Sequence, residues 1–124
     1  MKDQGGYLGL EEYVRDRLID AGFAASSTYR TGDGGADIVV RGASGQIDYL
    51  VQCKFTTKID LPIDAGLCED ALRMRKNWKA PKAIVIGVTN ARNFAPRVKD
   101  QFKQLGGQLI TRDDLPQFRP WKAS

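Results

Sequence analysis

Residues 33–54 read DGGADIVVRGASGQIDYLVQCK, a glycine-rich turn followed by two short apolar segments that flank a small polar loop. Each apolar segment has the length and residue types of a β-strand, so the sequence predicts a hairpin here. Three polar residues lie on these strands: Asp37, Gln52 and Lys54. Because a buried polar group without a partner is costly, we interpret the three residues as parts of one site that the rest of the chain holds in place.

The register of this hairpin decides whether the three side chains meet. Successive side chains of a strand point to opposite faces, so Gln52 and Lys54 share one face of their strand. If Arg41 faces Asp48, then Asp37 faces Gln52 directly across the hairpin. A slip of one residue would turn Asp37 to the other face of the sheet. The site therefore requires Asp37 and Gln52 to be close cross-strand neighbours.

Helix and strand patterns alternate along the rest of the chain. Apolar residues recur at helical spacing in some segments, and β-branched or continuous apolar runs mark the strands. We expect helices over residues 7–21, 65–78 and 93–105, and strands over residues 23–30, 37–41, 47–55, 82–89 and 108–111. A helix, an antiparallel three-strand meander, and then helix, strand, helix and strand predict an α/β fold. Its mixed β-sheet would carry helices on both faces.

The length of 124 residues suits one domain with a modest core. We expect this domain to occupy residues 1–124, with a core over about residues 7–115 and a tail over residues 116–124. The apolar run at residues 82–89 is typical of a strand that is buried on both faces. Asp64 precedes the second helix at the position of an N-cap, so we expect it to cap that helix.

The composition points to a cytoplasmic protein without a membrane anchor. No apolar run approaches the roughly 20 residues that span a bilayer, and no apolar segment near the start resembles a signal peptide. Cys53 and Cys68 are the two cysteines, and they do not form a CxxC pair. We therefore interpret both as reduced thiols in the cytosol. The formal charge of +4 fits a polyanionic partner such as nucleic acid.

The chain contains no histidine, and this restricts the chemistry more than the charge does. It excludes Ser-His-Asp catalysis and every zinc site that uses histidine, and two separate cysteines do not form a structural zinc site. Any metal would be a hard cation held by carboxylates and carbonyls, such as Mg²⁺ or Mn²⁺.

The three polar residues of the hairpin match such a cation site. The Asp37 carboxylate can bind Mg²⁺, and the Gln52 amide oxygen and the backbone carbonyl of Cys53 can assist. The Lys54 ammonium can steady a hydroxide or the charge on a phosphate under attack. A glutamate of the first helix could complete the site. Simpler roles stay open: a turn residue for Asp37, and a solvent-facing edge strand for Gln52 and Lys54.

The two segments DGGADIVV and YLVQCK together resemble the core of the PD-(D/E)xK nuclease superfamily. They most resemble its Mrr-type restriction endonuclease branch, in which glutamine replaces the acidic residue of the last motif. The resemblance extends along the chain. Residues 9–23 are similar to the opening helix of that family, residues 84–90 to its buried strand and Thr-Asn turn, and residues 109–115 to its closing strand. About 110 of the 124 residues are covered.

The resemblance implies a restriction-endonuclease-like mixed sheet and Mg²⁺-dependent hydrolysis of phosphodiester bonds in DNA, which Mn²⁺ is also expected to support. It implies that Asp37 and Glu11 bind the metal, that Gln52 and the carbonyl of Cys53 assist, and that Lys54 orients the attacking water or stabilises charge. Without the resemblance, Glu11 would be explained by its favourable place near the start of a helix. We expect basic residues to contact the DNA backbone, namely Lys58, Arg73, Arg75 and Lys76.

Other functions of the same fold stay open. A Holliday-junction resolvase or another structure-selective nuclease would share the fold and would act as a homodimer. A nuclease toxin would act with an acidic immunity partner. A catalytically inactive relative would bind nucleic acid without cleaving it.

Overall fold

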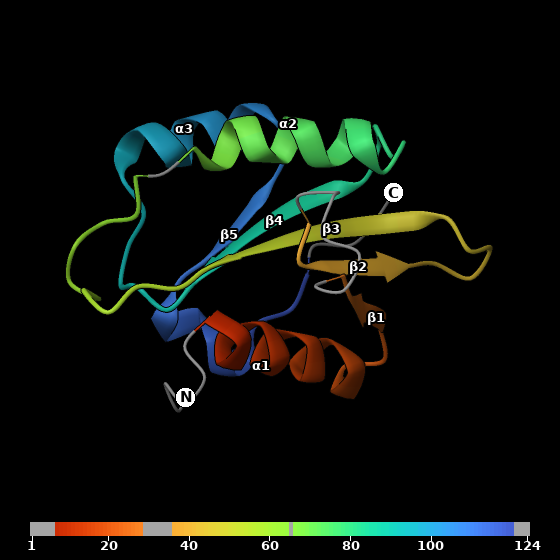
Figure 1. Ribbon diagram of the computed structural model, residues 1–124, viewed down its shortest axis with the longest axis horizontal. Helices are drawn as coiled ribbons and strands as arrows, with labels where there is room; N and C mark the ends of the chain where they lie inside the picture. The colour runs from red at the N-terminus through yellow and green to blue at the C-terminus, as the bar shows by residue number, and fades with distance from the viewer. Residues whose placement is uncertain (1–6, 29–35, 65, 121–124) are drawn as a thin grey trace.

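The computed structural model describes residues 7–28, 36–64 and 66–120, so the predicted turn at residues 31–35 lies outside the described residues. The elements follow the predicted order (Figure 1). They are α1 (Tyr7–Asp20), β1 (Ala24–Ser27), β2 (Ile38–Arg41), β3 (Ile47–Lys54), α2 (Leu67–Asn77), β4 (Ile84–Thr89), α3 (Pro96–Gln104), β5 (Gln108–Ile110) and the 3₁₀ helix η1 (Arg112–Gln117). None of the helices in this described part is long and apolar enough to cross a membrane.

The strands form one mixed sheet in the order β1-β2-β3-β4-β5. The first three strands are antiparallel neighbours, while β3, β4 and β5 run parallel to one another. Short connections allow the antiparallel meander, whereas parallel neighbours need a crossover, which α2 and α3 provide. The predicted α/β fold with a mixed sheet and a meander is therefore confirmed.

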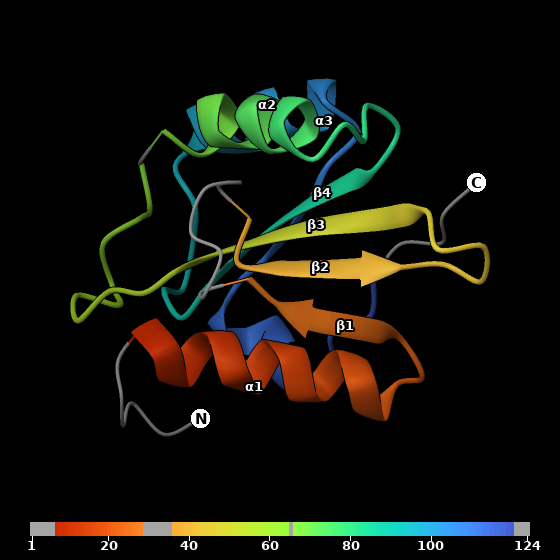
Figure 2. The ribbon, with the colours of Figure 1, turned by 45° about the vertical axis from the view of Figure 1, so that its right-hand side comes forward.

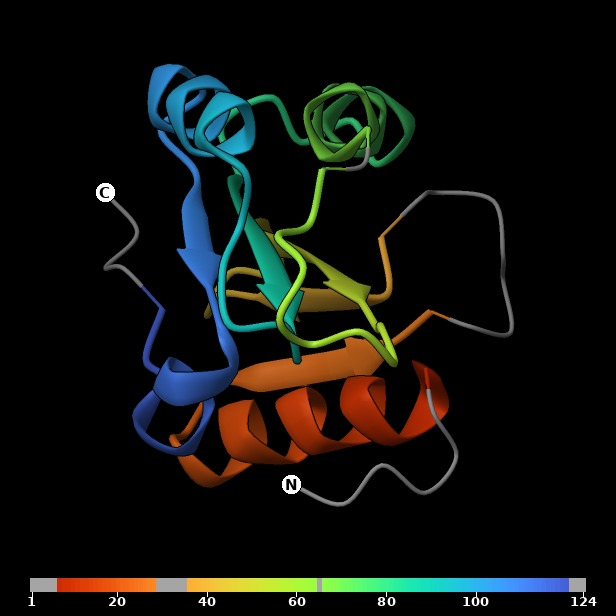
Figure 3. The ribbon, with the colours of Figure 1, turned by 90° about the vertical axis from the view of Figure 1, so that its left-hand side faces the viewer.

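Helices cover both faces of the sheet, as predicted. Figure 3 shows α2 and α3 side by side over one face, with α1 and η1 against the other. Leu10, Val14 and Leu18 form the buried stripe of α1, at a spacing that keeps them on one side of the helix. On the other face, α2 buries Leu67 and Met74.

Strand β4 is the most enclosed strand of the sheet. Val85 packs on the α2 face and Ile86 on the α1 face, and both are fully buried. This confirms the prediction from its continuous apolar run, because a strand between two helical layers has no solvent-facing side.

The register of β2 on β3 determines how the polar residues of the hairpin are placed. Val39 pairs with Leu50 and Ile38 with Val51, as expected. The expected pairing of Arg41 with Asp48 is wrong, because Arg41 lies opposite Ile47. A bulge between Val40 and Arg41 adds one residue on the β3 side near the loop. The irregularity stays at the loop end, so the register toward Asp37 is unaffected.

The expected capping of α2 by Asp64 is also wrong. The N-cap is Gly66, and no side chain makes the capping hydrogen bond. The Asp64 carboxylate instead accepts from Arg97 of α3, with 2.6 Å between Oδ1 and Nη2. Asp64 thus forms an exposed ion pair with α3 instead of a helix cap.

The C-terminal segment continues the core beyond β5. Leu115 of η1 and Phe118 after it are buried in the same apolar cluster as the α1 stripe. The packed part of the chain therefore reaches Phe118, three residues beyond the core expected from the sequence.

Candidate active site

The polar residues of the hairpin lie where several elements end or begin. The C-terminal end of β3 and the N-terminal parts of α1 and α2 lie toward the same end of the molecule, at the left in Figures 1 and 2. This end of the sheet is also the end from which β3 and β4 lead into loops. Side chains from four different elements can therefore approach one another here.

Asp37 lies at a bend just before β2. Its backbone N–H donates to the carbonyl of Val51 at 2.8 Å, and its Oδ2 accepts from the backbone N–H of Cys53 at 2.7 Å. These two contacts bracket Gln52, so Asp37 stands opposite Gln52, in agreement with the register of the strands. From the β1 side, Thr28 donates its backbone N–H to the carbonyl of Asp37 at 2.9 Å. The carboxylate is thus fixed against the backbone at the end of β3.

Glu11 brings a second carboxylate to Asp37 from α1. Its side chain is buried, at 1% exposure, and neither carboxylate oxygen has a hydrogen-bond partner among the described residues. Burial and, next, the charge of Asp37 raise the pKa of Glu11 from 4.5 to about 7. Two neighbouring carboxylates repel each other, and a proton or a cation between them relieves that repulsion. Such perturbed groups are characteristic of functional sites.

Cys53 lies beside the same two carboxylates but takes no part through its sulfur. Its side chain is buried in the apolar cluster under α1. Burial, followed by the charges of Asp37 and Glu11, raises the pKa of the thiol well above its usual range. The sulfur therefore stays protonated, and the residue can serve the site through its backbone.

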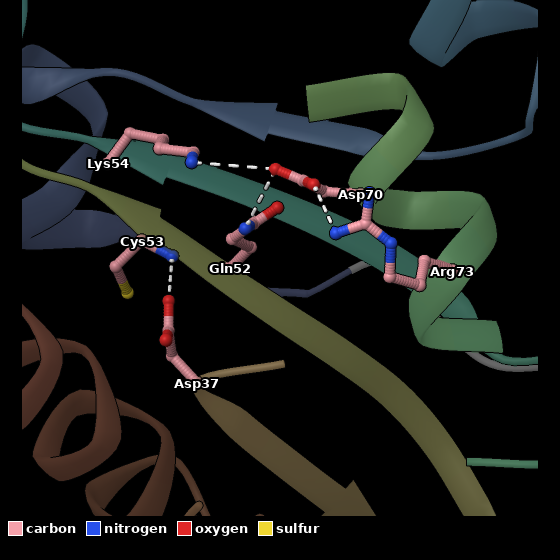
Figure 4. Close-up of polar contacts among 6 residues, drawn as sticks. All are labelled: Asp37, Gln52, Cys53, Lys54, Asp70 and Arg73. Atoms are coloured by element: carbon pink, nitrogen blue, oxygen red, sulfur yellow. Dashed lines mark hydrogen bonds and ion pairs between the residues drawn. The ribbon is translucent and has the colours of Figure 1, made fainter. Parts of the chain in front are cut away.

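Gln52 and Lys54 lie together on the opposite, α2 side of β3 (Figure 4). The Gln52 Nε2 donates to Asp70 Oδ2 at 3.2 Å, and Lys54 Nζ lies 3.5 Å from the same oxygen. Arg73 Nη1 donates to the other Asp70 oxygen at 3.2 Å. The remaining amide oxygen of Gln52, Oε1, is buried and has no hydrogen-bond partner in the described part of the chain.

The expected convergence of the three hairpin residues on one point is therefore only partly found. Gln52 and Lys54 do share a face, but the Asp37 carboxylate turns to the backbone of Cys53 and toward Glu11. The bend at Asp37 causes this, because it takes the residue out of the regular alternation of β2. The polar groups form two sets that flank the end of β3. We call Glu11 and Asp37 the α1 side, and Gln52, Lys54 and Asp70 the α2 side.

Asp70 contacts two of the candidate site residues, Gln52 and Lys54, and the sequence reasoning missed it. It lies in the first turn of α2 and follows Leu67 by three residues, at the edge of the buried stripe. A carboxylate at that spacing is a usable signal, because a polar residue next to an apolar stripe faces the sheet rather than solvent. Its side chain is 20% exposed and contacts both hairpin residues of the α2 side.

The four basic residues expected at DNA differ in their availability. Arg75 donates from Nε to the carbonyl of Ala83 and from Nη2 to the carbonyl of Leu105, both at 3.0 Å. Two of its donors are already bound by backbone, so Arg75 is less available to phosphate than the other three residues, and its contact with DNA stays a prediction. The other three remain exposed: Lys58, Arg73 and Lys76.

The donor set fits a hard cation. Among the described residues, the buried side-chain oxygens without a hydrogen-bond partner are those of the Glu11 carboxylate and the Gln52 amide, and oxygen donors of these kinds suit Mg²⁺ and Mn²⁺. No cluster of three or more histidine, cysteine, aspartate or glutamate side chains occurs within residues 7–28, 36–64 and 66–120. A cation here would thus depend on two carboxylates, completed by amide and backbone oxygens.

Comparison with known proteins identifies the family. No curated protein and no solved structure matches the chain. Residues 6–118 match the family model Mrr_cat, described as restriction endonuclease. The match covers nearly the whole chain, from α1 to Phe118, and includes both sides of the site. The chain therefore belongs to the Mrr_cat restriction endonuclease family and is a nuclease domain.

Proposed function

We propose that this nuclease is a Mg²⁺-dependent endonuclease that hydrolyses phosphodiester bonds in DNA, with Mn²⁺ as an effective substitute. The observation that carries the proposal is the buried carboxylate of Glu11 beside Asp37, whose oxygens have no hydrogen-bond partner among the described residues. Burying such a group is costly unless a ligand completes it. A divalent cation would complete it and would explain why two acidic groups are held together.

Each residue has a role that follows from its place. Asp37 and Glu11 would hold the cation from the α1 side, while the Gln52 amide oxygen and the Cys53 carbonyl would add neutral oxygens. When bound, the cation supplies an activated water and neutralises phosphate charge. Lys54 would orient that water or stabilise the charge that develops on the phosphate, because its ammonium is held at the same end of β3 by Asp70.

A DNA substrate agrees with the surface charge. The chain carries a formal charge of +4, and Lys58, Arg73 and Lys76 are exposed on the loop after β3 and on α2. Cations at these positions would bind phosphates and release counterions. Binding should therefore weaken steeply as salt is raised.

The test is cleavage of plasmid, linear duplex, single-stranded and four-way-junction DNA with Mg²⁺ or Mn²⁺. We expect Lys54→Ala to lower the cleavage rate by at least about 100-fold, because it removes the ammonium next to the reacting phosphate. Lys99→Ala is the matched control, since Lys99 is an exposed lysine of α3. Equal rates for wild type and Lys54→Ala would refute the proposed site.

The substrate panel also separates the other functions of this fold. Cleavage confined to the four-way junction would identify a junction resolvase. DNA binding that survives Lys54→Ala, together with no cleavage under any condition, would identify a binding module without catalysis.

A further inference from the structure

We infer that Asp70 is a positioning residue that holds the nitrogen of the Gln52 amide at α2 and so leaves its oxygen, and not its nitrogen, for the cation. The inference rests on the proposed metal-dependent nuclease and names a residue that acts on its site from α2. A carboxamide has one oxygen that can bind a cation and one NH₂ group that cannot, and the two are similar in size. A glutamine ligand therefore needs a partner that distinguishes its two ends.

Asp70 can make this distinction because an ionised carboxylate only accepts hydrogen bonds. Asp70 Oδ2 lies 3.2 Å from Gln52 Nε2, so the NH₂ end is held at α2. The opposite end, Oε1, is then left buried and without a hydrogen-bond partner among the described residues. In Figure 4 the Gln52 amide lies between Asp70 and β3, with its nitrogen on the dashed line to Asp70.

Asp70 is itself held in place. Its other oxygen, Oδ1, accepts from Arg73 Nη1 at 3.2 Å, one helical turn further along α2. Lys54 Nζ lies 3.5 Å from the oxygen that Gln52 uses. The Asp70 side chain is 20% exposed and the Lys54 side chain 31%, so water competes only partly for these contacts. Asp70 thus connects the amide and the ammonium of the site to a rigid helix.

The need for such a residue follows from glutamine at position 52. A glutamate would offer two equivalent oxygens, and either could bind the cation in any orientation. With glutamate, a second carboxylate at about the same distance as Asp70 would repel it rather than orient it. Asp70 should therefore matter to metal binding when residue 52 is glutamine and should lose its importance when residue 52 is glutamate.

The experiment measures Mn²⁺ binding by the free-ion signal in electron paramagnetic resonance, for the full chain without DNA. We expect Asp70→Ala to weaken Mn²⁺ binding about tenfold, which is the usual effect of losing a residue that orients a metal ligand. Asp70→Asn should also weaken binding, by about threefold to tenfold, because asparagine offers a donor as well as an acceptor and no longer distinguishes the two ends of the Gln52 amide. Asp64→Ala is the matched control, since it removes an ion-paired carboxylate before α2 and outside the site.

The second arm repeats Asp70→Ala in a Gln52→Glu background. We expect the tenfold loss to shrink to less than about twofold, because glutamate needs no orientation. An equal loss in both backgrounds would overturn the inference, and so would unchanged binding in Asp70→Ala alone. In either case wild-type Mn²⁺ binding and cleavage would leave the nuclease proposal standing. Absence of Mn²⁺ binding in the wild type would overturn both.

Cleavage assays give a further readout for the same variants. In Asp70→Ala the Mn²⁺ concentration for half-maximal rate should rise about tenfold, and the rate at saturating Mn²⁺ should also fall, because Lys54 loses the carboxylate that holds its ammonium. A faster Asp70→Ala enzyme would contradict the inference, because it would mean that Asp70 restrains Lys54 instead of positioning the site.

Discussion

The two sides of the β3 end differ in how well their polar groups are satisfied. On the α1 side, Glu11 is buried and its oxygens have no hydrogen-bond partner in the described residues. On the α2 side, Gln52 and Lys54 contact the carboxylate of Asp70, which also forms an ion pair with Arg73. The first arrangement is costly to the fold without a ligand, and the second is a preformed hydrogen-bonded network, although the buried Gln52 Oε1 also has no partner among the described residues. Under the proposed function, the carboxylates of the α1 side would hold the cation, and the α2 side would supply the Gln52 oxygen and the Lys54 ammonium.

The largest expected effect comes from Asp37 on the α1 side. Asp37→Asn should lower the rate of DNA cleavage by on the order of 1,000-fold, because it removes the charge that holds the cation. The asparagine oxygen can still accept from the backbone N–H of Cys53, so the fold should persist. The comparison is made with Mg²⁺ in excess, and circular dichroism confirms folding.

Asp100→Asn is the control for this substitution, because Asp100 is an exposed carboxylate of α3. If Asp37→Asn retained wild-type activity, the α1 side would not be the cation site. The contrast between the two sides would then be a matter of folding alone.

The next effect concerns stability and pH. The pKa of Glu11 is about 7 in the folded chain and 4.5 ordinarily, so the folded state binds the extra proton between these values. The free energy of unfolding should therefore fall as pH rises from about 4.5 to 7, by up to about 3 kcal/mol from this group, and then level off. Glu11→Gln should remove this component and be the more stable protein at pH 8, with little difference at pH 4.5.

Urea denaturation of wild type and Glu11→Gln across this pH range measures the difference. Adding Mn²⁺ at pH 8 should stabilise the wild type and not Glu11→Gln, because the cation takes the place of the proton. Parallel stability profiles for the two proteins would show that the Glu11 carboxylate is satisfied by other means, and the contrast between the two sides would disappear.

Much of the fold could be predicted from the sequence because it depends on local patterns. The spacing of Leu10, Val14 and Leu18 marks a helix, and the continuous apolar run of β4 marks a strand between two layers. The departures are long-range. Asp64 lies where an N-cap is expected from the sequence, but its carboxylate forms an ion pair with Arg97, which is far along the chain. Such competition is invisible until the helices are docked on the sheet.

Sequence reasoning named most of the polar residues at the end of β3 but not how they are arranged. Strand alternation alone pairs Gln52 with Lys54, whereas Glu11 was found through the family resemblance. The separation into two sides depends on the bend at Asp37 and on the backbone N–H of Cys53, a contact that no pattern of side chains encodes. Asp70 carries a weak signal at the edge of a helical stripe, and its target becomes clear only when α2 is placed over β3.

The smallest expected effect separates two arginines of α2 that look equivalent in the sequence. Arg75 donates two hydrogen bonds to backbone carbonyls, which join α2 to the segment before β4 and to the end of α3. Arg75→Lys should lower the free energy of unfolding by about 2 kcal/mol, because an ammonium cannot span both carbonyls. Arg73 is an exposed partner of Asp70, and Arg73→Lys should cost less than about 0.5 kcal/mol.

The same pair should behave in the opposite way toward DNA. Arg75→Lys should leave DNA affinity and its salt dependence unchanged, because the guanidinium is bound to two backbone carbonyls and lysine keeps the charge. Arg73→Ala removes an exposed cation on the α2 side. It should therefore weaken DNA binding and reduce the slope of log affinity against log salt by about one. Urea denaturation and DNA titration at several salt concentrations measure both properties. Weaker DNA binding by Arg75→Lys than by Arg73→Ala would contradict this prediction. It would mean that α2 contacts DNA through Arg75, and that Gln52, Lys54 and Asp70 lie further from the DNA than we infer.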